Sequence, residues 1–130
     1  MNWLAIMVAT GIYFVILFFW YYPSLFGNTW LKLVGKTEVP KEKIIWESIL
    51  LVGTSFVTVL ILAYLLELTA TIDILKGLII SLLVYAGFVL MVGINQDVFN
   101  DRTNIKLFLI EYGVYLPCFV VSGLILTLWQ

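Results

Sequence analysis

The sequence predicts an all-α integral membrane protein folded as a four-helix bundle. Three observations lead to this fold class: the composition, four long apolar runs, and the placement of the basic residues. Of 130 residues, 63% are hydrophobic and 12% are charged, whereas a soluble domain is close to half apolar and about a quarter charged. A soluble fold of this size has too little interior for so many apolar side chains, so we expect lipid to surround them.

Four apolar runs are each long enough to cross a bilayer, which takes about 20 residues. The first run lacks a preceding basic segment and exceeds the apolar core of a usual secretory signal, so we interpret it as a membrane span. The chain is therefore predicted to be a single transmembrane domain, residues 1–130. Its spans are predicted at about 3–22, 44–66, 74–94 and 105–129.

The connection between the first two spans has an amphipathic pattern of its own. Its apolar residues recur at helical spacing, namely Leu25, Phe26, Trp30, Leu33 and Val34. This pattern predicts a short amphipathic helix in the membrane interface, ended by Gly35, with Pro40 in the first turn of the second span. The two interpretations are a gate or lipid-sensing flap and, with fewer assumptions, an anchored connector.

The basic residues predict the orientation of the chain in the membrane. Six of the seven lie in or beside two connections, 23–43 and 95–104, and are Lys32, Lys36, Lys41, Lys43, Arg102 and Lys106. Only Lys76 belongs to the opposite side. Because basic residues concentrate in cytoplasmic loops, we predict a multi-pass protein of the cell membrane with both connections in the cytoplasm and both termini outside.

Aromatic residues mark the expected ends of the spans. Trp3 and Trp20 bracket the first run, and seventeen residues at a helical rise give roughly 26 Å, close to the hydrocarbon thickness. Rings of this kind anchor helices at the membrane–water interface. The predicted interfacial anchors are Trp3, Trp20, Phe26, Trp30, Trp46 and Trp129.

The fourth run contains a polar stripe that is the candidate functional site. Glu111, Tyr115, Cys118 and Ser122 follow one another at steps of four, three and four residues, so they share one helix face. Polar groups inside a membrane are costly, and a stripe of them is expected to face other helices. Pro117 lacks the N–H that would bond four residues back, so it predicts a kink in this span.

Glu111 allows two interpretations. In the first, it is a protonatable group that binds a cation or exchanges it for a proton. In the second, it lies near the interface, is hydrated, and pairs with Lys106 or another base or hydrogen-bonds between helices. Cys118 is interpreted as a packing residue.

Small residues at helical spacing predict close contacts between helices. They lie in the first three spans, at Ala5, Ala9, Gly53, Thr54, Ser55, Thr58, Gly77, Ser81, Ala86, Gly87 and Gly93. From sequence, these faces either close the bundle or form the interface of a homo-oligomer.

The sequence offers little for catalysis, metal or nucleic acid. It has no His, one Cys and a net charge of −1, so the commonest general base, a redox pair and a basic surface are all missing. The oxygen-rich segment 95–101 lacks calcium-loop spacing and suits turns and the N-cap of the fourth helix, together with Thr103. We predict no catalytic residue, no metal site, no cofactor and no nucleic-acid partner.

Segments at both ends of the chain resemble a known family. These are MNWLAI at 1–6, WYYPSLFG at 20–27 with Trp30, KLFLI at 106–110, YG at 112–113, SG at 122–123 and LW at 128–129. They are similar to the uncharacterised four-span membrane family named domain of unknown function 1761, with no established activity. In that family Asn often replaces Glu111 and His often replaces Tyr115. The resemblance therefore implies a polar, hydrogen-bonding role at position 111 rather than a required carboxylate.

The predicted function is that of a small polytopic membrane protein without enzymatic activity, structural or binding to lipid or a partner. The expected partners are membrane lipid and either a second copy of the chain or another membrane protein. The alternative is a small homo-oligomeric transporter or channel that uses the stripe on the fourth span. An enzyme acting on a lipid or quinone is the third hypothesis, with only Tyr, Glu and Asp as acid–base groups.

Overall fold

A computed structural model describes residues 1–35, 41–102 and 104–130, so Lys36, Pro40 and Thr103 lie outside the described residues. The described regular elements are all helical, and four helical stretches are long and apolar enough to cross a membrane. The predicted all-α membrane bundle is therefore confirmed. The elements are α1 (Trp3–Trp20), η1 (Pro23–Gly27), α2 (Asn28–Val34), α3 (Lys41–Leu68), α4 (Ile74–Val84), η2 (Tyr85–Leu90), α5 (Met91–Phe99), α6 (Ile105–Gly113) and α7 (Tyr115–Leu128).

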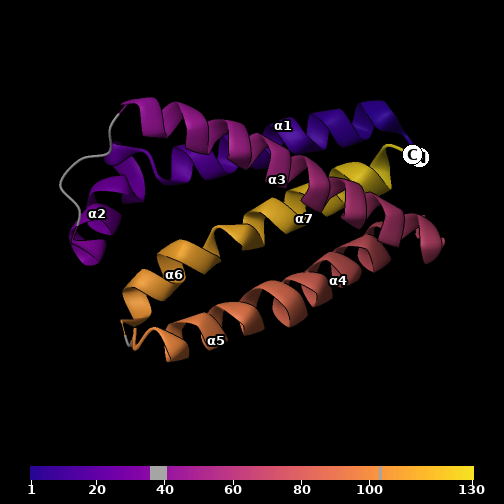
Figure 1. The fold of residues 1–130 in the computed structure, drawn as a ribbon. Helices are drawn as coiled ribbons and strands as arrows, with labels where there is room; N and C mark the ends of the chain where they lie inside the picture. Colours follow the sequence, from indigo (N-terminus) through magenta and orange to yellow (C-terminus); the bar gives the residue numbers. More distant parts are fainter. Residues whose placement is uncertain (36–40, 103) are drawn as a thin grey trace.

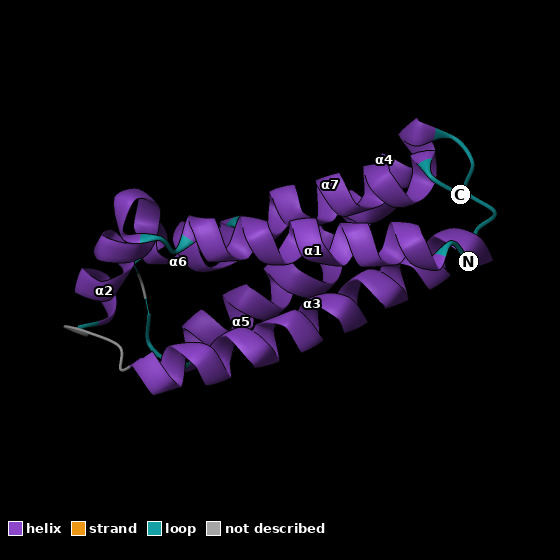
Figure 2. Cartoon of the chain, turned by 90° about the horizontal axis from the view of Figure 1, so that it is seen from above, coloured by secondary structure: helices purple, strands orange, loops and turns teal. Residues whose placement is uncertain are grey.

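The fourth span is the centre of the bundle. α7 packs against α1, α3 and α4, and α1 packs against α3 (Figure 1). Both chain termini lie at one end of the molecule, here called the termini end, where Asn2 Nδ2 donates to the carbonyl of Trp129 at 3.2 Å (Figure 2). The opposite end, the loop end, holds α2 and the α5–α6 connection. The two connections rich in basic residues therefore share one end of the bundle.

The helix ends differ from the predicted span ends in the first three spans, and α3 (Lys41–Leu68) exceeds the predicted 44–66 at both ends. α1 stops at Trp20 rather than near residue 22, because Pro23 disfavours helical backbone in the residue before it, and Tyr22 is extended at φ −68° and ψ 143°. The third span continues to Phe99 rather than 94, with Asn100 N donating to Gln96 O at 3.0 Å. Hydropathy detects the apolar part of a helix, whereas backbone hydrogen bonds continue beyond it.

The predicted interfacial helix is present in two pieces. η1 carries a kink at Leu25, and α2 follows it and ends at Gly35, whose φ of 75° is the left-handed conformation expected at a helix end. α2 contacts α6, and Trp20 stacks on Phe26 with ring centroids 4.6 Å apart. A side chain at Gly27 would lie 2.9 Å from the carbonyl carbon of Tyr22, so this tight return of the chain requires glycine.

Small residues make a close crossing between α4 and α7. A Cβ atom at Gly77 of α4 would lie 3.0 Å from Thr127 Cβ, and one at Gly123 of α7 would lie 2.9 Å from Ser81 Cβ. Ser81 Oγ donates to the carbonyl of Gly77 at 2.8 Å, so its polarity is satisfied within α4. These residues close the bundle. By contrast, Gly53, Ala86 and Gly87 face outward.

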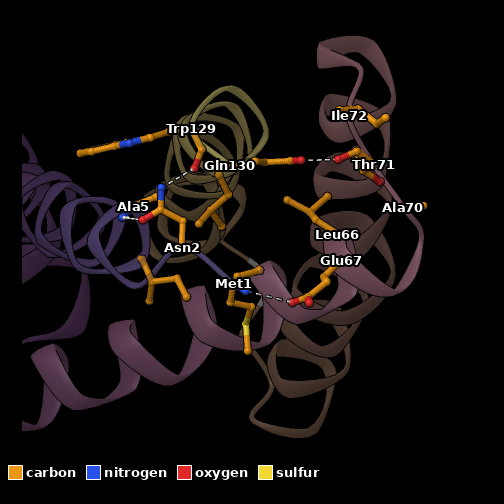
Figure 3. Close-up of a pocket in the computed structure, with 13 residues that line it drawn as sticks. Met1, Asn2, Ala5, Leu66, Glu67, Ala70, Thr71, Ile72, Trp129 and Gln130 are labelled. Atoms are coloured by element: carbon orange, nitrogen blue, oxygen red, sulfur yellow. Dashed lines mark hydrogen bonds and ion pairs between the residues drawn. The ribbon is translucent and has the colours of Figure 1, made fainter.

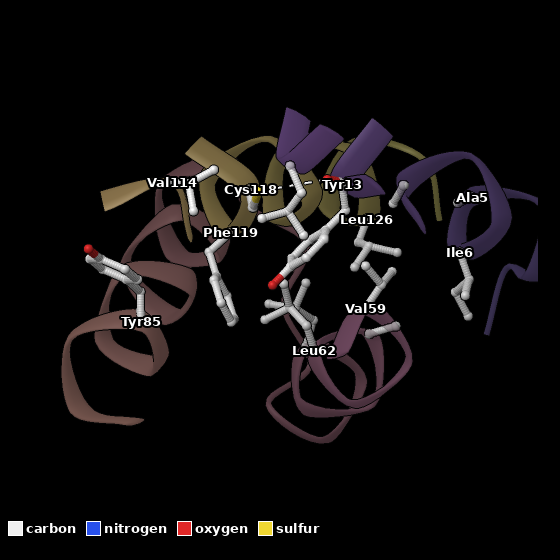
Figure 4. Packing of buried hydrophobic residues seen from close by; sticks show 14 residues of the cluster. Ala5, Ile6, Tyr13, Val59, Leu62, Tyr85, Val114, Cys118, Phe119 and Leu126 are labelled. Carbon is white, nitrogen blue, oxygen red and sulfur yellow. Dashed lines mark hydrogen bonds between the residues drawn. The ribbon is translucent and has the colours of Figure 1, made fainter. Parts of the chain in front are cut away.

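The buried core lies in the middle of the bundle, where α1, α3 and α7 meet. Tyr13, Val59, Leu62 and Phe119 are all buried there (Figure 4). Phe119 contacts Tyr13 edge-on, with ring centroids 6.1 Å apart. The rings of Tyr13, Phe119 and Tyr85, called the aromatic layer from here on, lie within this core.

Candidate functional site

Glu111 forms an ion pair at the loop end. Asn104 caps α6 by accepting from Lys106 N at 3.0 Å and Leu107 N at 3.3 Å, which fixes where the fourth span begins. Arg102, two residues before Asn104, extends its side chain along the first turns of α6, and its Nη1 donates to Glu111 Oε1 at 2.7 Å. The carboxylate is therefore paired with Arg102 and not with Lys106, and it lies within two turns of the helix start.

Asp97 lies beside this pair, on the last turns of α5. It is 8% exposed, and its Oδ1 is buried without a hydrogen-bond partner among the described residues. Its carbonyl oxygen accepts from the backbone N of Arg102 at 2.8 Å. Asp97, Arg102 and Glu111 are called the charged cluster from here on. A cavity of about 250 Å³ adjoins it, lined by Ile94, Asp97, Val98, Arg102, Asn104, Ile105 and Phe108.

The burial of Asp97 follows from a close contact between α5 and α6. A Cβ at Gly93 would lie 2.7 Å from Tyr112 Cδ1, so the ring of Tyr112 packs directly on the backbone of α5. Asp97 is one turn after Gly93 and faces the same way. The segment 95–101 is predicted from sequence to be a loop, and that prediction is wrong for Asp97, which lies in α5. Because the helix continues past residue 94, Gly93 and Asp97 lie on one face of α5.

The rest of the polar stripe packs against α1 instead of joining the charged cluster. The ring of Tyr115 lies 6.4 Å from that of Tyr13, and Cys118 Sγ is 3.8 Å from the Tyr13 carbonyl oxygen. Cys118 and Ser122 are buried, and Ser122 Oγ has no hydrogen-bond partner among the described residues. The four stripe residues thus share a face but no common cavity.

Backbone hydrogen bonding of the fourth span is weakened beside Pro117, although Val114 keeps helical φ and ψ of −61° and −31°. The hydrogen bond from Cys118 N to Val114 O is stretched to 3.4 Å. Two neighbouring carbonyls accept bonds from other spans: Trp20 Nε1 donates to Ile110 O and Tyr85 Oη donates to Tyr112 O, each at 3.0 Å. Side chains from two other spans therefore bond to the fourth span just before Pro117.

The predicted interfacial anchors fall into two groups, those with exposed rings and those that pack against other helices. Those with exposed rings are Trp3, Phe26, Trp46 and Trp129. Trp20 is half-buried and bonds to α6, and Trp30 packs edge-on against Tyr21 with ring centroids 5.7 Å apart. Trp20 and Trp30 therefore link the end of α1 with α2 and α6.

A second cavity, of about 650 Å³, opens at the termini end (Figure 3). Its floor is apolar, with Ile6, Leu66 and Leu126, and Glu67 Oε2 at its rim lies 3.8 Å from the amino group of Met1. The side-chain amide of Gln130 donates to the carbonyl of Thr71. Sequence reasoning missed this cavity because three segments distant in sequence form it.

The ion pair between Arg102 and Glu111 is expected to stabilise the loop end. Arg102→Ala leaves the partly buried carboxylate unpaired and should lower the free energy of unfolding by about 1 to 2 kcal/mol, between the values for surface and buried pairs. Glu111→Gln keeps an acceptor for the guanidinium and should cost less. A double-mutant cycle by thermal unfolding in one detergent measures the coupling. A coupling of zero would mean that the pair contributes nothing.

These features define a class: a four-span helical membrane protein whose intramembrane polar residues are mostly packed, with a charged cluster at one end. Within that class, the chain belongs to the family described as Protein of unknown function (DUF1761), whose model matches residues 4–127. The resemblance noted in the sequence is thereby confirmed. No curated protein and no solved structure matches the chain.

Proposed function

We propose that the protein is a non-enzymatic membrane scaffold that binds membrane lipid or a partner membrane protein, a second copy of itself included. The observation that carries this proposal is the packing of the stripe on the fourth span. Cys118 and Ser122 are fully buried, and neither lines the cavity at the loop end or the cavity at the termini end. Polar side chains packed in this way hold helices together.

The buried side chains between the two cavities support the same proposal. Tyr13, Val114, Cys118 and Phe119 lie between the ends of the bundle, and each is at most 4% exposed. A solute that passed along the fourth span would have to displace these buried side chains. The charge of Glu111 is balanced by Arg102, which fits a structural role for that carboxylate.

A transporter or channel is the second candidate. The weakened backbone hydrogen bonding beside Pro117 favours it, because discontinuous membrane helices often form transport sites. In this alternative the helix would change its bend, and the charged cluster would receive a cation from the loop end. A single chain of four spans rarely encloses a pathway, so this function would need a homo-oligomer.

The native cysteine offers a direct test. Cys118 is the only cysteine in the sequence, so no background residue needs replacing. The protein in sealed vesicles is treated with a membrane-impermeant maleimide from each side. We expect Cys118 to remain unlabelled from both sides and to react fully after denaturation, because it is buried against α1.

Two control variants make this result interpretable. In a Cys118→Ala background, Thr69→Cys lies at the termini end and Asn100→Cys lies at the loop end, and both positions are exposed. They should label from opposite sides, and Asn100→Cys from the cytoplasm if the proposed orientation is correct. Labelling of Cys118 from either side, or labelling that a solute changes, would contradict the scaffold proposal and make transport the leading function.

A further inference from the structure

In the charged cluster, one of the two carboxylates has no ion pair with a described residue. Arg102 and Glu111 neutralise each other, whereas Asp97 has no ion pair among the described residues. The formal charges of one guanidinium and two carboxylates leave one negative charge on this cluster. A carboxylate oxygen that is buried without a donor is costly, so Asp97 Oδ1 lacks a hydrogen-bond donor among the described residues, and a cationic donor would also balance the charge.

The surroundings of Asp97 indicate where such a donor would come from. The cavity beside it is walled by Ile94, Val98 and Ile105, whose side chains are exposed on the outside of the bundle. Such apolar walls suit acyl chains better than water. The third span, Ile74–Phe99, has 26 residues and is roughly 39 Å long, which exceeds the hydrocarbon thickness of about 30 Å. Asp97 near its end therefore reaches the level of the lipid headgroups.

We propose that this cavity binds the headgroup of a phospholipid that carries a primary ammonium group. The ammonium donates to Asp97, and the acyl chains lie along Val98 and Ile105. The guanidinium of Arg102 has five N–H donors; one bond to Glu111 is formed, and the others are offered to the lipid phosphate. This assignment deepens the proposed function, since it rests on lipid binding and names the lipid class.

The test compares headgroups in which methyl groups replace the N–H donors of the ammonium one at a time. The purified protein is incubated with chain-matched phosphatidylethanolamine, its N-methyl and N,N-dimethyl forms, and phosphatidylcholine, and bound lipid is counted by native mass spectrometry. We expect retention to fall along this series, with phosphatidylethanolamine retained about tenfold better than phosphatidylcholine, as for one charge-assisted hydrogen bond. Equal retention across the series would overturn the proposal.

A matched pair of variants locates the site. Asp97→Asn removes the charge and should abolish the preference for phosphatidylethanolamine, whereas Asp101→Asn, four residues away and exposed, should preserve it. Asn suits the positive φ of 54° at position 101, so this control changes only the charge. Preference that survives in Asp97→Asn would overturn the proposal.

The lipid assignment and the proposed function fail in different ways. Chain-matched phosphatidylglycerol is included as an anionic lipid, and a preference for it over phosphatidylethanolamine would mean that the basic residues alone select lipid, which overturns the role of Asp97. Loss of all lipid preference with Cys118 still protected from maleimide would overturn the lipid site and leave a scaffold for a protein partner. Labelling of Cys118 would overturn the scaffold itself.

Discussion

Replacing Gly123 with Val is expected to lower the free energy of unfolding by about 2 to 3 kcal/mol, at the upper end for an overpacked site. Gly123 lies where α7 crosses α4, and even a Cβ there would come within 2.9 Å of Ser81 Cβ. The two helices would have to separate. In lipid, helix association depends on close van der Waals packing, so separation removes the interaction that holds the third span in place.

Gly53→Val is the matched control. Gly53 lies within α3, and a Cβ there would meet no heavy atom within 4 Å. Its replacement should change stability by less than about 0.5 kcal/mol, as for other surface substitutions. Thermal unfolding of both variants in the same detergent, checked by recovery of folded protein from membranes, measures the difference. Equal stability of the two variants would show that the α4–α7 crossing is not a tight contact.

Replacing Phe119 with Ala is expected to cost about 3 to 4 kcal/mol, within the range for deleting a buried ring. Phe119 is 4% exposed and contacts Tyr13 of α1 and Tyr85 of the third span, with ring centroids 6.1 and 6.2 Å away. Its removal leaves a cavity in the aromatic layer. Maleimide labelling of Cys118 should also become faster, because Cys118 is the residue before it.

Phe88→Ala deletes the same ring where it faces outward. Phe88 belongs to η2 and is 72% exposed, so lipid replaces the ring and the loss should stay below about 1 kcal/mol. Unfolding of the two variants in the same lipid nanodisc provides the comparison. A loss at position 88 that equals the loss at position 119 would place an interface with another molecule on the outer face of the third span.

The spans could be predicted because hydropathy depends only on local composition. The backbone must satisfy its own hydrogen bonds in lipid, so a long apolar run has essentially one available structure. The precise ends could not be predicted in this way. Pro23 ended α1 early through a steric effect on Tyr22, and the third span continued through polar residues to Phe99 because its backbone bonds continued.

The candidate site was predicted only in part. Periodicity placed Glu111, Cys118 and Ser122 on one face, since side-chain direction follows from helix geometry. It gave no information on distance between segments. That Glu111 pairs with Arg102 depends on the turn at Asn100 and Asp101, and that Asp97 is buried depends on the contact between Gly93 and Tyr112.

The sequence by itself determined that the chain is a four-span helical membrane protein, with both basic connections on one side. Those properties follow from composition and from the length of apolar runs. The tertiary structure alone decided which small residues close the bundle and which face outward, and that Asp97 is left without a donor. Contacts of this kind depend on how helices cross, and crossing positions are set by side chains from several spans at once.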